Sequence, residues 1–144
     1  MSTTPTLNGQ VIGQAHYATR SLLERATGPL GLSFGQVVAL NALAAGPVER
    51  AQLVHRITST LKIDEPAVRE LIDGLVDADL VQVDGSAPHL RLTDGGRATQ
   101  TRVADAVAGI TARLYRDIPA GEAEVAARVL TVVTQRANAE LAGA

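Results

Sequence analysis

The chain has 144 residues, of which 46% are hydrophobic and 2% aromatic, and its formal net charge is −2. This length and composition are typical of one globular domain with its own core. The absence of cysteine excludes disulfides, thiolate metal sites and cysteine nucleophiles. The scarcity of aromatic residues argues against single-strand binding by base stacking, and the low net charge means that any binding to nucleic acid depends on local arginines.

Two features of the chain bear on its location. No segment has the run of about 18 apolar residues that a membrane span needs. The N-terminal "MSTTPTLNGQ" has neither the basic nor the apolar region of a signal peptide. We therefore expect a cytoplasmic protein that does not enter a membrane.

Four helices are predicted before residue 80. Apolar residues recur at helical spacing over 7–27, and Gly28 and Pro29 then break the pattern. A capping box of Ser33 and Gln36 begins the second helix, which ends at Gly46-Pro47. The third and fourth helices are predicted over about 48–61 and 65–78, the fourth with Asp64 as its N-cap and Pro66 in its first turn.

The stretch "LVQVDGSAPHLRLTDGG", residues 80–96, has a different pattern. Apolar and polar residues alternate on both sides of a Gly/Ser/Pro cluster, which predicts a β-hairpin. A lone hairpin is marginally stable, so it must lean on the helices. Thr93 can then cap a long helix from Asp94 to about Asp117, and a last helix is predicted over about 120–141. Compact helices followed by a hairpin indicate a mainly α fold with a two-stranded wing, a winged helix-turn-helix.

Several segments resemble, in order, those of the MarR family of dimeric winged-helix transcription regulators. "LSFGQVVALNALA" is similar to the family's helix opening, and "VRELIDGLVDADLV" to its recognition helix leading into the wing. "LRLTDGGR" resembles the second wing strand with the start of the long helix, and "IPAGEAEVAARVLTVV" the terminal helix. The resemblance covers roughly Leu7 to Leu141.

The resemblance implies one domain over 1–144, with dimerisation helices at 7–27 and 94–142 around a DNA-binding lobe at 33–93. It implies a homodimer that binds a pseudo-palindromic operator in double-stranded DNA and acts as a repressor. It also implies a small anionic or phenolic effector, bound between the dimer region and the lobe, that shifts the population of lobe spacings.

The sequence departs from the family pattern at three places. Gly85 and Ser86 stand where the family wing carries arginines, and the wing is shortened. The stretch between Ile57 and Val68 is about one helical turn longer, which extends the third helix to Leu61. The face of the fourth helix predicted to be exposed is acidic, and carboxylates oppose binding to a polyanion; its residues are Glu65, Arg69, Glu70, Asp73, Gly74 and Asp77.

The candidate DNA contacts are basic and hydroxyl side chains of the lobe. Arg56, Arg69 and Arg91 are the principal ones, and four more can contact phosphates: Arg50, Lys62, Ser59 and Thr60. For the arginines the alternative is plain exposure or an intramolecular ion pair with Glu49, Glu65 or Asp73. For the hydroxyls it is capping or simple exposure.

The candidate effector site lies on the first helix. His16, Tyr17 and Arg20 cluster there, and Arg20 can pair with a carboxylate through two hydrogen bonds. Asn41 interrupts an apolar face and is a further candidate. The alternative for Tyr17 is a core or dimer-interface position.

Neither a catalytic nor a metal site is predicted. The histidines His16, His55 and His89 lack the spacing of a helical metal pair, and no hydrolase elbow or phosphate loop is present. We expect no cofactor. The competing function is a winged-helix dimer with weak or no operator binding that binds a small molecule or another protein.

Overall fold

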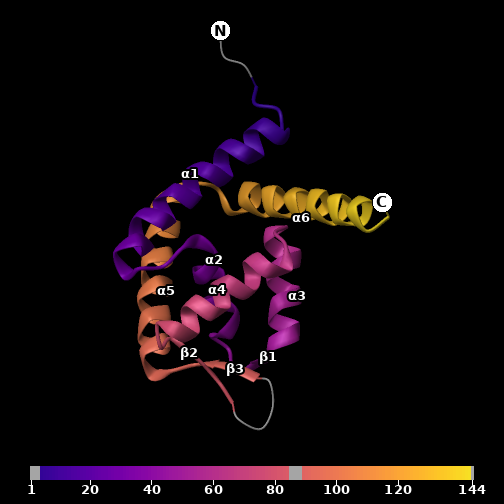
Figure 1. The fold of residues 1–144 in the computed structure, drawn as a ribbon. Coiled ribbons are helices and arrows are strands. Elements are labelled where there is room, and N and C mark those ends of the chain that lie inside the picture. The colour runs from indigo at the N-terminus through magenta and orange to yellow at the C-terminus, as the bar shows by residue number, and fades with distance from the viewer. Residues whose placement is uncertain (1–3, 85–88, 144) are drawn as a thin grey trace. The chain divides into compact units, whose positions relative to one another are not determined.

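The computed structural model describes residues 4–84 and 89–143 and distinguishes two compact units, residues 1–110 and 111–144. The helices are α1 (Gly9–Thr27), the short 3-10 helix η1 (Gly28–Leu30), α2 (Phe34–Leu43), α3 (Arg50–Leu61), α4 (Glu65–Asp77), α5 (Asp94–Leu114) and α6 (Ala120–Gly143). The strands are β1 (Val48–Glu49), β2 (Val81–Val83) and β3 (His89–Leu92). The mainly helical fold with a small antiparallel sheet is confirmed (Figure 1).

Three of the predicted helix starts are confirmed by their hydrogen bonds. The Ser33 hydroxyl oxygen accepts a hydrogen bond from the backbone amide of Gln36 at 3.2 Å, and the side-chain oxygen of Gln36 accepts one from the backbone amide of Ser33 at 3.1 Å. Asp64 caps α4 through the amide of Ala67 at 3.0 Å, and Thr93 caps α5 through the amide of Gly96 at 2.9 Å. Each cap satisfies an amide that the helix itself leaves without a partner.

A third strand joins the predicted hairpin. β2 and β3 pair in antiparallel register, with Val81 opposite Leu92, and β1 pairs on the other edge of β3, with Val48 opposite Leu90. The prediction that the third helix begins near Val48 is therefore wrong. After Gly46, whose φ is 147°, the chain is extended. Val48 and Glu49 then pair with the free edge of β3 before α3 begins at Arg50.

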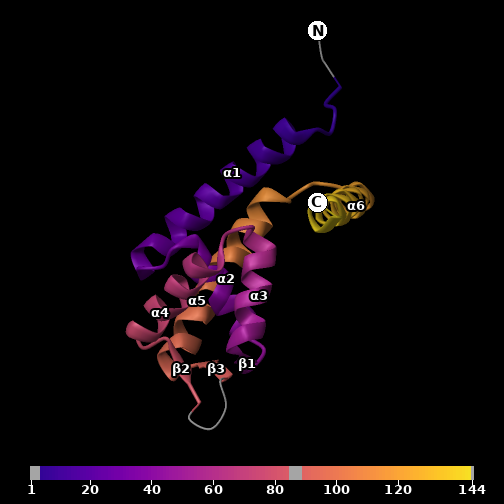
Figure 2. The ribbon, with the colours of Figure 1, turned by 45° about the vertical axis from the view of Figure 1, so that its right-hand side comes forward.

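One hydrophobic core joins α2, α3, α4, the sheet and the first half of α5. Its largest fully buried side chains include one or more from each of these elements: Leu40, Leu53, Ile57, Ile72, Leu75, Leu90 and Val103. The later turns of α1 lie alongside α2, and Leu23 packs against the core (Figures 1 and 2). The sheet lies at one end of the helical group (Figure 1).

Close approach of α4 to α2 corrects one exposure prediction. A Cβ on Gly74 would lie 2.8 Å from Nε2 of Gln36, and a Cβ on Gly35 would lie 2.6 Å from a methyl carbon of Leu71. Gly74 is half-buried and faces α2 rather than solvent. The other five residues predicted on the exposed face of α4 are exposed.

The second unit, residues 111–144, contains the last turn of α5 and all of α6. α5 ends at Leu114, slightly before the predicted end, and Asp117 has a left-handed φ of 64° ahead of Pro119. No residue of α6 is buried, although its sequence includes exposed Val125, Leu130 and Leu141. Over the described residues, no helix is long and apolar enough to cross a membrane.

Candidate nucleic-acid interface

The helices α3 and α4 form a helix-turn-helix. α3 buries Leu53, Val54 and Ile57, and α4 buries Val68, Ile72 and Leu75. Lys62 separates the helices in the left-handed conformation, with a φ of 58°, so the turn is short and Asp64 begins α4 at once. Because the apolar faces meet the core, the polar faces of both helices are available to a ligand.

Three of the predicted DNA-contacting residues lie together on α3. Arg56, Ser59 and Thr60 border a shallow hollow that His55 also lines. Arg56 is exposed, and no ion pair within residues 4–84 and 89–143 involves it. The ammonium of Lys62 donates to the carbonyl of Ser59 at 2.5 Å, which holds this predicted phosphate contact beside the end of α3.

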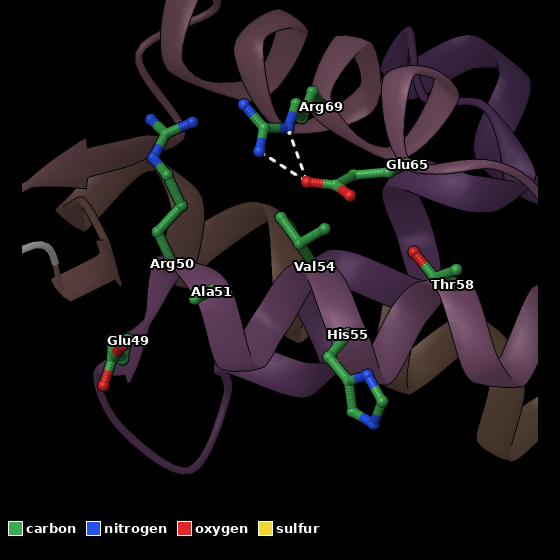
Figure 3. A pocket seen from close by; sticks show the side chains of 8 residues that line it. All are labelled: Glu49, Arg50, Ala51, Val54, His55, Thr58, Glu65 and Arg69. Carbon is green, nitrogen blue, oxygen red and sulfur yellow. Dashed lines mark hydrogen bonds and ion pairs between the residues drawn. The ribbon is translucent and has the colours of Figure 1, made fainter.

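A second hollow of about 350 Å³ lies between α3 and α4 (Figure 3). Its lining combines three basic side chains with two carboxylates and a hydroxyl: Arg50, His55, Arg69, Glu49, Glu65 and Thr58. The Thr58 hydroxyl oxygen is buried and has no hydrogen-bond partner among the described residues. This hollow opens beside the start of α4, where a recognition helix meets base edges.

Two of the predicted arginines take part in ion pairs here. Arg69 donates from Nε and Nη2 to one oxygen of Glu65, at 3.1 and 2.5 Å (Figure 3). Arg50 reaches Asp73 more loosely, with 3.8 Å between Nη1 and Oδ1. Arg69 and Arg50 thus both form an intramolecular ion pair, which was the alternative to a DNA contact. All four side chains are more than a third exposed, so these pairs contribute little stability.

The wing carries a third paired arginine. Arg91 Nε lies 3.0 Å from Oδ1 of Asp84. Gln82 is opposite Arg91 in the β2–β3 register, and its amide oxygen, turned toward the guanidinium, accepts from Nε and Nη2 at 3.0 and 2.7 Å. Arg91 is exposed. Gly85 and Ser86 lie outside the described residues.

The predicted effector residues gather at the junction of α1 and α2. His16 packs edge-on against Tyr17, with 5.4 Å between ring centroids, and against Phe34, at 6.2 Å. The Arg20 guanidinium lies 4.3 Å from the centroid of the Phe34 ring and pairs with Glu24 at 3.4 Å. Tyr17 is 67% exposed, so it is not a core residue of this chain.

Phe34 was not predicted as part of this cluster. Phe34 follows the Ser33 cap directly and so lies in the first turn of α2. It is the only phenylalanine of the chain, and this was the one feature of the sequence that could have indicated its part in the cluster. Asn41 makes a different contact, since its side-chain oxygen accepts from Gln100 at 3.2 Å and so links α2 to α5.

The histidines lie on three separate elements, α1, α3 and β3. Within the part of the chain that the structure describes, no three histidine, aspartate or glutamate side chains are grouped so that they could hold a metal ion.

No family model matches the sequence, and no curated protein matches it significantly. Solved structures do match. The transcriptional repressor CouR aligns with a TM-score of 0.76 and 25% identity, over 90% of this chain and 93% of its own. A MarR family protein of Mycobacterium tuberculosis, in a complex with DNA, aligns with a TM-score of 0.66 and 23% identity over 90% and 98%.

A third neighbour is BpsR of Bordetella bronchiseptica, described with a mechanism for regulation of its DNA binding by 6-hydroxynicotinic acid. It aligns with a TM-score of 0.72 and 19% identity, over 92% of this chain and 98% of its own. The structural neighbours that span nearly the full chain are MarR family transcriptional regulators.

Proposed function

We propose that this chain, which has the MarR-like winged-helix fold, is a ligand-responsive transcriptional regulator that binds a pseudo-palindromic operator as a homodimer and acts as a repressor. The observation that carries the proposal is the helix-turn-helix followed by the two wing strands β2 and β3, within a chain that aligns over 90% of its length with a MarR family protein bound to DNA. A fold by itself does not imply a function, so the proposal also needs exposed residues of this lobe that can contact DNA.

In the proposed complex α4 enters the major groove and the wing reaches the adjacent minor groove. Arg69 reads base edges. Arg91, which contacts Asp84 and Gln82 on the wing, makes the minor-groove contact. The remaining contacts go to phosphates and set affinity rather than sequence preference. They come from Arg50, Arg56, Ser59, Thr60 and Lys62.

The homodimer is proposed to use α1, α5 and α6. Apolar side chains on each of these helices are exposed in the single chain, among them Val11, Val107, Leu114, Leu130 and Val133. A helix with apolar positions and no buried residue needs a partner surface, and a two-fold dimer of identical chains provides one.

The effector is proposed to bind at the cluster of His16, Tyr17 and Arg20, which Phe34 completes. Asn41, the fourth predicted effector residue, contacts Gln100 of α5 instead. An aromatic ring can stack on this cluster, and Arg20 can pair with an anionic group on the same molecule. BpsR, whose DNA binding is regulated by 6-hydroxynicotinic acid, supports an effector that combines these two features.

One observation favours the competing function. Arg50, Arg69 and Arg91 each face a carboxylate, and α4 exposes Glu70 and Asp77 as well. A lobe with these charges releases few counterions when it meets DNA. A winged-helix dimer that binds a small molecule or a protein instead would tolerate them.

The test is fluorescence anisotropy with labelled duplex from the upstream region of the gene, titrated at several salt concentrations against a scrambled duplex. We expect preferential binding to the native duplex with a salt slope of a few phosphates per subunit. Arg56→Ala should weaken binding to both duplexes and reduce that slope, whereas Arg102→Ala, at an exposed position of α5, should leave both unchanged. If duplexes drawn from a random pool are also bound without preference, the competing function is the correct one.

A further inference from the structure

We propose that Glu65 is a positioning residue that orients Arg69 to recognise a guanine in the major groove. The inference rests on the proposed function and adds to it the base that α4 reads and the residue that sets this preference. In this proposal Glu65 favours DNA binding because it orients Arg69, although the carboxylate of Glu65 is itself repelled by the phosphates of DNA.

The pair is joined through one edge of the guanidinium only. Nε and Nη2 of Arg69 both donate to the same oxygen of Glu65, one helical turn earlier (Figure 3). A guanidinium has five N–H donors in a planar fork. The contact with Glu65 uses one hydrogen on each of Nε and Nη2, so both hydrogens of Nη1 and the second hydrogen of Nη2 remain. In Figure 3 the third nitrogen of Arg69 points away from Glu65.

The remaining edge matches one base better than the others. Nη1 and Nη2 each direct a hydrogen away from the side chain, and these two parallel donors fit the two acceptors N7 and O6 of guanine. Adenine and thymine each offer one acceptor there with a donor or a methyl group, and cytosine offers a donor. An arginine oriented in this way therefore discriminates guanine from the other three bases.

Fixing the side chain also increases the contribution of each contact. Arg69 is 62% exposed, so without Glu65 it would sample many rotamers, and binding would have to restrict them. The ion pair restricts the guanidinium before DNA arrives. Its position at the N-terminal end of α4 is where recognition helices contact base edges.

A comparison with Arg50 distinguishes an ion pair that orients an arginine from one that only offsets its charge. Arg50 approaches Asp73 through its terminal nitrogen Nη1, at 3.8 Å, which is too long for a hydrogen bond. The Asp73 carboxylate partly offsets the charge of Arg50 there but does not fix the direction of the guanidinium. The Glu65–Arg69 pair instead holds the lateral edge by two hydrogen bonds and leaves the terminal edge open.

The experiment selects preferred duplexes from a random pool with the full-length wild-type chain, and then measures affinity for the selected duplex and for versions with each base pair changed. The variants are Glu65→Gln, Glu65→Ala and Arg69→Ala. Glu70→Gln is the matched control. Glu70 is the next acidic residue after Glu65 on α4, it is exposed, and it forms no ion pair among the described residues. Circular dichroism checks that each variant is folded.

For the wild type we expect a guanine in each half-site whose replacement weakens binding by about 5- to 150-fold. Arg69→Ala should abolish that preference. Glu65→Ala should reduce it at the same position without abolishing it, and the double variant should lose no more than Arg69→Ala does. Glu65→Gln, which keeps an acceptor without the charge, should reduce the preference to an intermediate value. Glu70→Gln should keep it in full.

Two results overturn the inference. If the wild type has no sequence preference, the proposed function fails and this inference fails with it. If the wild type prefers a sequence, but Glu65→Ala retains every preference and binds all duplexes more tightly than Glu70→Gln does, the inference alone fails. In that case Glu65 masks the charge of Arg69 and does not orient it.

Discussion

The winged-helix lobe, residues 33–93, and α6 are both rich in apolar residues, yet they use them differently. Leu53 of the lobe is 0% exposed, within a core formed by four helices and a sheet, whereas Leu130 of α6 is 40% exposed and no residue of α6 is buried. The difference shows that a compact set of short helices can complete its own core, while a long helix with an apolar face depends on a second surface. The predictions below test this contrast, from the largest expected effect to the smallest.

The same substitution should have different consequences in the two regions. We expect Leu53→Ala to lower the free energy of unfolding by about 3–4 kcal/mol at any protein concentration, because it leaves a cavity in the core. The loss from Leu130→Ala should depend on protein concentration, because in the proposed dimer that side chain is buried against the partner subunit. Urea denaturation at two protein concentrations measures both. A large loss from Leu130→Ala that does not vary with concentration would mean that α6 packs within its own subunit.

Two adjacent glycines test the junction between the wing and α5. A Cβ on Gly96 would lie 1.9 Å from the carbonyl oxygen of Leu80, whereas a Cβ on Gly95 has no atom nearer than 3.7 Å. Gly96→Ala should cost about 2–3 kcal/mol, because the backbone of Leu80 must move. Gly95→Ala should be neutral or stabilise by up to about 1 kcal/mol through helix propensity. Thermal denaturation of the two variants is the measurement, and equal effects would contradict the close approach.

A charge on the apolar face of α6 should separate the subunits without unfolding the lobe. We expect Leu130→Glu to weaken dimerisation by about 2 kcal/mol, or roughly thirtyfold in Kd, because it buries an unpaired carboxylate. Light scattering over a dilution series measures the shift, and circular dichroism should show the helical signal retained. Gln135→Glu adds the same charge at another exposed position of α6 and should leave the dimer intact. A wild-type chain that is monomeric at micromolar concentration would contradict the dimer itself.

The smallest effect concerns a helix start in the lobe. Ser33→Ala removes the hydroxyl that accepts from the amide of Gln36, and should cost about 1 kcal/mol of unfolding free energy. Ser21→Ala, at an exposed position within α1, should change stability by only a few tenths of a kcal/mol. Chemical denaturation compares the two, and an equally small effect at Ser33 would mean that the cap does not contribute to the stability of the lobe.

Much of the fold followed from local patterns. Ser33, Asp64 and Thr93 each cap the helix predicted for it, and the alternation on either side of the Gly/Ser/Pro cluster predicted both strands of the hairpin. β1 was missed because two residues carry no periodicity of their own. Val48 and Glu49 are extended only because β3, far along the chain, offers them a free edge.

The candidate site was predictable as a set of residue types and less so as a set of partners. From the sequence, Arg69 could either be exposed without a partner or form an ion pair with Glu65. The spacing of four residues along a helix made the ion pair possible but could not show that it forms. The contact of Arg20 with Phe34 joins α1 to α2, so spacing along either helix could not indicate it. The DNA-binding and effector roles of these residues stay predictions.

The sequence by itself determined the capped helix starts at Ser33, Asp64 and Thr93, where the hairpin lies and which faces are apolar, because caps and side-chain periodicity act over about four residues of chain. The tertiary structure decided that β1 completes the sheet, that Gly74 faces Gln36, and that Asp84 and Gln82 hold Arg91. These contacts depend on which distant segments the core brings together. A single ion pair or a two-residue strand contributes too little free energy to select its partner before the core has formed.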